Sequence, residues 1–123
     1  MDQSEIRIIK DKISGAELRL FLGHPFEEMI KFVVDVEREI VAIGGEMHAD
    51  AEQILLENGS RQINVWGGNI YPGAEEDKKI EYIALINVRP SENNRSMEIQ
   101  DGALRKKIRT VLDKLIEWRS EPE

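Results

Sequence analysis

The sequence contains no cysteine, which excludes a disulfide framework, a thiolate nucleophile and a cysteine-based zinc site. No apolar run approaches the roughly 20 residues that a membrane-spanning helix needs. The charged N-terminal segment lacks the apolar stretch of a signal peptide. These absences predict a cytoplasmic protein without a membrane partner.

Basic residues are outnumbered by acidic ones, with 17 Lys and Arg against 24 Asp and Glu and a formal net charge of −7. A polyanion such as DNA is repelled by such a surface on average, and no basic stripe with interleaved aromatic residues opposes this. We therefore expect no nucleic-acid partner. The length of 123 residues suits one domain, residues 1–123, with a core of its own.

Known catalytic and cofactor motifs are also missing. The sequence has no phosphate-binding P-loop, no GxSxG elbow, no HExxH pair and no EF-hand loop. No cofactor can therefore be named, and an enzymatic activity stays an open alternative.

Hydrophobic patterning and capping residues predict a mixture of strands and helices. Ser14 and Glu17 form a capping-box pattern, and Asp50 and Asp101 are suitable N-caps for two further helices. Asn58 and Gly59 should end the middle helix. We expect strands at 5–10, 62–71 and 79–88, and helices at 14–23, 50–58 and 101–118.

The segment 30–43 fits two structures. Its apolar residues are compatible with a helical stripe, but two β-rich runs on either side of Glu37, Arg38 and Glu39 favour a hairpin that turns near Glu37 and Arg38. With the hairpin, the order of elements predicts a single α+β domain. Its mainly antiparallel sheet would have about five strands and three or four helices on one face, with the C-terminal helix packed on the sheet.

The first candidate site lies in the segment 44–60. Glu46, His48, Asp50 and Glu52 occupy every second position there. An imidazole beside carboxylates could act as a general base, with His48, Asp50 and Glu46 as catalytic candidates, or bind a metal through His48 and Asp50. A plainer interpretation is favoured, in which Asp50 caps a helix and His48 packs at a strand end, because zinc sites normally recruit several His or Cys ligands.

The second candidate site is the loop 89–96. Arg89, Asn93, Asn94 and Arg95 could bind a small anionic ligand, since arginine forks and turn amides suit phosphate or carboxylate groups. The alternative is a turn in which the asparagines bond their own backbone. The alternative is favoured, although long loops are more often functional than short ones.

The third candidate site surrounds Gly67 and Gly68. Trp66 and Asn69 flank these glycines, so a ligand could lie against the backbone and an aromatic face. A core tryptophan beside a β-bulge or a close backbone approach is the favoured explanation. The glycine spacing is not that of a dinucleotide-binding loop.

Three blocks of the sequence carry a family resemblance, namely GGEMHADAEQILLENGS at 44–60, WGGNIYP at 66–72 and INVRPSENNRS at 86–96. The chain resembles a small prokaryotic family known only as a domain of unknown function. The resemblance extends over nearly the whole chain and implies a self-contained cytoplasmic protein of bacteria or archaea. It implies no activity or cofactor, and it adds slightly to the preference for the hairpin.

Three functions are compatible with these features. The leading hypothesis is a soluble small-ligand or anion-binding module, in which His48 shares a pocket with Arg89, Asn93, Asn94 or Arg95. The first alternative is a small metal-assisted or acid–base enzyme that uses His48 with nearby carboxylates. The second is a homodimeric interaction module that associates through an uncovered face of the sheet.

Overall fold

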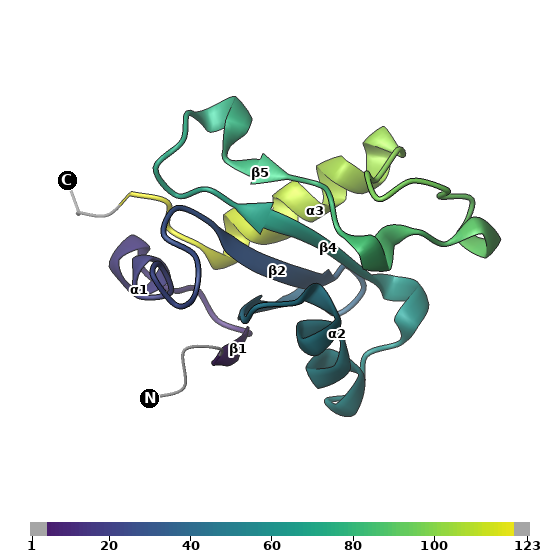
Figure 1. Cartoon of the computed structure of the whole chain (residues 1–123), viewed down its shortest axis with the longest axis horizontal. Helices are drawn as coiled ribbons and strands as arrows, with labels where there is room; N and C mark the ends of the chain where they lie inside the picture. Colours follow the sequence, from purple (N-terminus) through teal and green to yellow (C-terminus); the bar gives the residue numbers. More distant parts are fainter. Residues whose placement is uncertain (1–4, 120–123) are drawn as a thin grey trace.

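The computed structural model describes residues 5–119, which form a single small α+β domain. Its centre is a five-stranded antiparallel sheet with the strand order β1-β3-β2-β4-β5 (Figure 1). The fold class expected from the sequence is confirmed. The strands are β1 (Ile6–Ile9), β2 (Ile30–Asp35), β3 (Ile40–Gly44), β4 (Val65–Ile70) and β5 (Ile80–Glu81).

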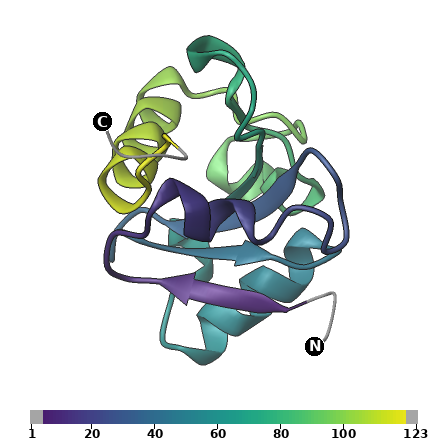
Figure 2. The same cartoon turned by 90° about the vertical axis from the view of Figure 1, so that its left-hand side faces the viewer.

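The helices lie on both faces of the sheet. One face is covered by α1 (Gly15–Arg19) and α3 (Gly102–Leu115), and the other by α2 (His48–Glu57) (Figure 2). The expectation that helices cover only one face was wrong. In β2, Phe32 and Val34 pack in the α3 core, while Val33 between them packs in the α2 core. A strand buried on both faces needs apolar residues on both, which explains the unbroken run at 32–34.

The hairpin expected at 33–43 is confirmed. β2 and β3 pair from Phe32 opposite Ile43 to Asp35 opposite Ile40. The turn has neither Gly nor Asn at its centre because Asp35 supplies the turn bonds itself. Its Oδ1 accepts hydrogen bonds from the backbone N–H groups of Glu37 and Arg38, each at 2.9 Å, and Glu39 takes a left-handed conformation with φ of 57°.

Three helix ends agree with the sequence, whereas the ends of α1 and α3 and the start of α2 differ; α3 ends at Leu115 rather than at 118. Ser14 and Glu17 form the expected capping box, although α1 ends at Arg19 and only turns follow it as far as Gly23. Asp101 caps α3, its carboxylate accepting from two backbone N–H groups. Asn58 ends α2 as expected.

Asp50 does not cap α2, so that expectation was wrong. The helix begins two residues earlier, at His48, and its N-cap residue Met47 makes no side-chain cap bond. Asp50 therefore lies in the first turn, where its exposed carboxylate faces the positive end of the helix dipole.

The strand expected at 79–88 is largely absent, because β5 contains only Ile80 and Glu81. A single-turn 3₁₀ helix, Leu85–Asn87, follows instead. The Asn87 side chain takes the place of a neighbouring strand: its Oδ1 accepts from the N–H of Gly67, and its Nδ2 donates to the carbonyl of Gly67, both at 2.9 Å. One amide thus satisfies both backbone groups of a residue in β4.

The glycine pair of β4 forms no bulge. Gly67 and Gly68 pair in continuous register with Val33 and Phe32, so the alternative of a close backbone approach is the correct one. A Cβ at Gly67 would lie 2.8 Å from the Cβ of Ala84, and one at Gly68 would lie 2.5 Å from the carbonyl oxygen of Glu81. Neighbouring segments therefore lie closer to these positions than any side chain allows.

Within residues 5–119, no helix has the length and apolar character needed to cross a membrane.

Candidate functional site

A cleft of about 410 Å³ opens on the α2 face of the sheet. It lies between the start of α2, the start of β2, the end of β4 and the segment 81–86. Strand alternation places Lys31 of β2 and Asn69 of β4 on this face, and the register places Glu81 of β5 opposite Asn69. The lining consists mainly of apolar side chains with a few polar groups: Met29, Lys31, Met47, His48, Ala49, Asn69, Tyr71, Glu81, Ile83, Ala84, Leu85, Ile86 and Met97.

His48, the first residue of α2, has a fixed orientation in this cleft. Its Nε2 lies 2.8 Å from the carbonyl oxygen of Gly68 and 3.1 Å from Oδ1 of Asn69. A carbonyl only accepts hydrogen bonds, so Nε2 must carry the proton. In the neutral ring Nδ1 is then an unprotonated acceptor. It has no partner within residues 5–119 and is not sealed from solvent.

Asn69 is oriented in turn by Glu81. Its Nδ2 donates to Oε1 of Glu81 at 2.8 Å, which leaves Oδ1 facing His48. The Tyr71 hydroxyl donates to the same carboxylate oxygen at 3.1 Å. An ionised carboxylate only accepts hydrogen bonds. Glu81 therefore accepts from Asn69, Asn69 accepts from His48, and the direction of both bonds is determined.

Burial lowers the pKa of His48 below its ordinary value of 6.5, and the nearby charge of Lys31 lowers it further. The hydrogen bonds to Gly68 and Asn69 oppose this shift, but less strongly than burial favours it. His48 is therefore neutral at pH 7. Burial and the Glu81 carboxylate raise the pKa of Tyr71, so its hydroxyl stays protonated and continues to donate.

The rim of the cleft is apolar and exposed. Met47, Leu85 and Met97 are 58, 72 and 46 % exposed. Thioether side chains are flexible and polarisable, so they adapt to apolar groups of varied shape. Exposed apolar side chains that gather around a hollow are typical of a binding surface.

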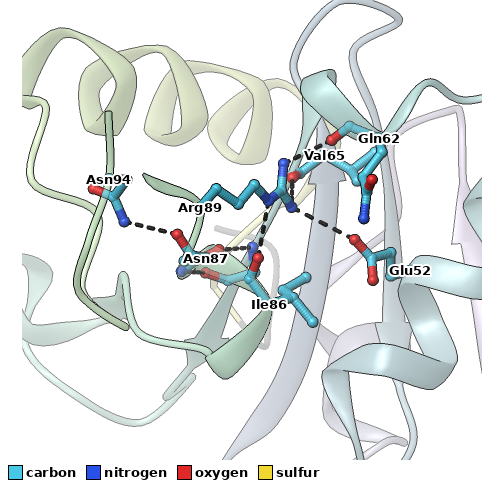
Figure 3. Close-up of polar contacts among 8 residues, drawn as sticks. Glu52, Gln62, Val65, Ile86, Asn87, Arg89 and Asn94 are labelled. Carbon is cyan, nitrogen blue, oxygen red and sulfur yellow. Dashed lines mark hydrogen bonds and ion pairs between the residues drawn. The ribbon is translucent and has the colours of Figure 1, made fainter. Parts of the chain in front are cut away.

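Arg89, in contrast, is fully engaged within the fold (Figure 3). Its guanidinium donates to the carbonyls of Ile86, Gln62 and Val65, and it forms an ion pair with Glu52 at 3.5 Å. It also stacks over the ring of Trp66, with its central carbon 4.4 Å from the ring centre, and is only 9 % exposed. These contacts tie the loop to β4 and α2, and they leave Arg89 little capacity for an anion.

Asn94 is engaged in the same way. Its Nδ2 donates to the carbonyls of Asn87, Ser96 and Glu98, and its Oδ1 accepts from the N–H of Gln100. The contacts of Asn94 agree with the turn interpretation of the loop. Asn93 takes a left-handed conformation with φ of 61°, and both Asn93 and Arg95 are exposed.

The expectation of one pocket shared by His48 and the loop was wrong. His48 and Asn69 line the cleft described above, whereas Trp66, Asn93 and Asn94 line a separate hollow of about 780 Å³ beside the start of α3. Arg89 and Arg95 line neither of the two.

The carboxylates near His48 in the sequence do not gather around it. Glu46 and Asp50 are exposed, and the imidazole forms its hydrogen bonds with Gly68 and Asn69. In the part of the chain that the structure describes, no group of three or more His, Asp or Glu residues is arranged to hold a metal ion.

Three polar residues of the cleft were not anticipated from the sequence, namely Lys31, Tyr71 and Glu81. A partial signal exists for Tyr71, since it follows Asn69 by two positions and therefore continues the same face of the chain. Glu81 carries no local signal, because its place opposite Asn69 depends on the pairing of β4 with β5.

Residues 7–115 match the model of the family described as Protein of unknown function (DUF5674). The chain belongs to this family. The resemblance to a family known only as a domain of unknown function is thereby confirmed. No curated protein and no solved structure shows significant similarity to the chain.

Proposed function

We propose that this protein binds a small, uncharged, amphipathic molecule in the cleft beside His48. The observation that carries the proposal is one oriented, neutral imidazole in a mainly apolar cleft with an exposed methionine rim. Small-molecule sites are typically concave and apolar, with a few polar groups that fix the orientation of the ligand.

The charges of the lining favour an uncharged ligand over an anion. Lys31 is the cation of the cleft and Glu81 its carboxylate, so the two charges offset each other. Arg89, the arginine most suited to an anion by sequence, uses its donors within the fold. An anion would therefore meet one lysine and no arginine fork.

A second candidate function is acid–base catalysis, because a neutral histidine with one free ring nitrogen can accept a proton. In such an enzyme the imidazole would be oriented by Gly68 and Asn69. Glu46 and Asp50, the carboxylates expected from the sequence, would not take that role.

The proposal is tested by titrating the ¹⁵N-labelled protein with three sets of fragments, uncharged amphipathic, anionic and cationic, and following the amide resonances. We expect saturable shifts with the uncharged set, concentrated at Gly67, Gly68, His48 and Met97. Ala49→Trp places a bulky ring at the exposed mouth of the cleft and should abolish the shifts. Gln53→Trp, at an exposed position of the same helix that does not line the cleft, is the matched control and should preserve them.

Absence of saturable shifts at these positions with all three sets of fragments would refute the proposed site. A clear preference for the anionic set would refute the uncharged ligand class and restore the anion-binding hypothesis.

A further inference from the structure

We infer that the ligand presents a hydrogen-bond donor, a hydroxyl or an N–H group, to Nδ1 of His48. This inference rests on the proposed function and specifies the chemistry of the group that enters the cleft. The site would thus select alcohols, phenols or N–H compounds over ethers and other molecules of the same shape without a donor.

The first step of the argument is the direction of the hydrogen bonds. The Glu81 carboxylate accepts from Asn69, which turns Oδ1 of Asn69 toward His48, where it accepts from Nε2 together with the Gly68 carbonyl. If the proton were on Nδ1, the lone pair of Nε2 would face the carbonyl oxygen of Gly68 and Oδ1 of Asn69. Three acceptor atoms would then lie together without a hydrogen between them. Such an arrangement is strongly unfavourable in a partly buried site.

The second step is the fixed position of the ring. The imidazole packs on Gly67, where a Cβ would lie 3.2 Å from Cδ2 of His48. The ring therefore lies close against the strand, and its two acceptors hold Nε2 toward the sheet. The nitrogen left for a ligand is Nδ1, which offers a lone pair.

The third step concerns the groups that could protonate or neutralise the ring. Lys31 from β2 disfavours a second proton, whereas Glu81 from β5 is separated from the ring by Asn69. Tyr71, which follows β4, donates to Glu81, and the segment 83–86 carries no titratable side chain. Glu46 and Asp50, from the segment of His48 itself, are exposed to solvent. The acceptor is therefore maintained at neutral pH.

The tautomer can be measured without any ligand. Long-range ¹H–¹⁵N correlation spectra of the full chain distinguish a proton on Nε2 from one on Nδ1. We expect the Nε2–H form for His48, while the exposed His24 serves as an internal shift reference. A proton on Nδ1 would overturn the inference, whether or not the cleft binds ligands.

The selectivity is tested with phenol and anisole, which have similar shapes but differ in the donor. We expect phenol to bind about fivefold more tightly, the ratio that a typical net hydrogen bond provides. Equal affinities would overturn the selectivity and leave the proposed function intact. Failure of both probes and of the fragment sets would overturn the proposed function together with the selectivity that depends on it.

A variant and a pH series complete the experiment. His48→Gln retains an amide that can donate to the Gly68 carbonyl but has no acceptor at the position of Nδ1, so it should bind both probes within about twofold of each other. In the unaltered protein, the preference for phenol should decrease as the pH falls and His48 gains a second proton. A preference that is independent of pH would overturn the inference, even if the variant does not fold.

Discussion

At the residue scale, Arg89 shows how a side chain that resembles a ligand site can instead hold the fold together. Three carbonyls from two parts of the chain surround its guanidinium, those of Gln62 and Val65 from one segment and that of Ile86 from another. Trp66 covers one face of the group. Because β5 ends at Glu81, these bonds contribute, in place of strand pairing, to the attachment of the loop 89–96 to β4.

We expect Arg89→Met to lower the free energy of unfolding by about 3 kcal/mol. The substitution leaves buried carbonyl groups without donors, and each such group costs about 1–3 kcal/mol. Arg95→Met, at an exposed position of the same loop, is the control and should change stability by less than about 0.5 kcal/mol. Urea denaturation of both variants measures the difference, and equal losses of stability would contradict the structural role of Arg89.

His48 should couple stability to pH. Its pKa is lowered in the folded protein, chiefly by burial, so below the unfolded value of 6.5 the unfolded chain binds more protons than the folded one. The stability that this histidine contributes is therefore complete above pH 6.5 and decreases as the pH falls below it. We expect the stability advantage of the unaltered protein over His48→Gln to shrink between pH 7.5 and 5.5 in urea denaturation series. An advantage that grows toward acid pH would show that His48 is stabilised in its charged form.

At the scale of elements, β4 depends on the absence of side chains at its centre. A Cβ at Gly68 would lie 2.5 Å from the Glu81 carbonyl oxygen and 2.6 Å from the ring of Phe32. We expect Gly68→Ala to cost about 1–3 kcal/mol, the usual cost of overpacking. Gly73→Ala, which meets no atom within 4 Å, should stay within about 0.5 kcal/mol of the unaltered protein in the same thermal and urea measurements.

The starts of α2 and α3 provide a paired test of capping. Asp101 accepts from the N–H of Ala103 at 2.9 Å, whereas Asp50 makes no cap bond. Asp101→Ala should therefore cost about 0.5–2 kcal/mol, and Asp101→Asn much less. Asp50→Ala should lose only its interaction with the helix dipole, about 0.3–1 kcal/mol. Melting curves that show the larger loss for Asp50→Ala would place the true N-cap at Asp50 and contradict the observed helix start.

The sequence predicts the elements whose signals are local. The capping box at Ser14, the cap at Asp101 and the hairpin at 33–43 depend on neighbouring residues, and all three are present. The segment 79–88 alternates like a strand, but its pairing is decided at a distance. Asn87 bonds both backbone groups of Gly67 and so replaces the ladder that a continued β5 would have formed.

The same distinction holds for the candidate site. His48 and Asn69 were suggested by the sequence because the histidine alternates with carboxylates at 46–52 and the asparagine flanks two glycines. Glu81 was not, because it acts on His48 only through Asn69 and only after β4 and β5 have paired. The loop residues Arg89 and Asn94 had a suggestive composition, yet their partners are backbone carbonyls, which no composition reveals.

At the scale of the whole molecule, the two-sided sheet bears on how copies of the chain could associate. The homodimer hypothesis relied on an uncovered sheet face, but α2 covers β2 and β3 on the face opposite α3. Buried residues from both layers surround the central strands, with Phe32 and Val33 fully buried on opposite faces. Association through a sheet face would therefore require α2 to leave.

The larger of the two cores should depend on α3, whose apolar stripe packs on the sheet. Leu112 is fully buried there, beside the buried Ile108, Val111 and Leu115. A small domain cannot leave so much apolar surface exposed, so truncation before Asp101 should abolish cooperative unfolding. Leu112→Ala should lower the free energy of unfolding by about 2–5 kcal/mol, as is usual for emptying a buried leucine site. Lys106→Ala, on the exposed side of the same helix, is the matched control and should change stability by less than about 0.5 kcal/mol.

A truncated chain that still melts cooperatively, with well-dispersed amide resonances, would show that the sheet and α2 form a stable unit alone. The face left by α3 would then be available to a partner, and the interaction-module hypothesis would replace ligand binding as the leading one.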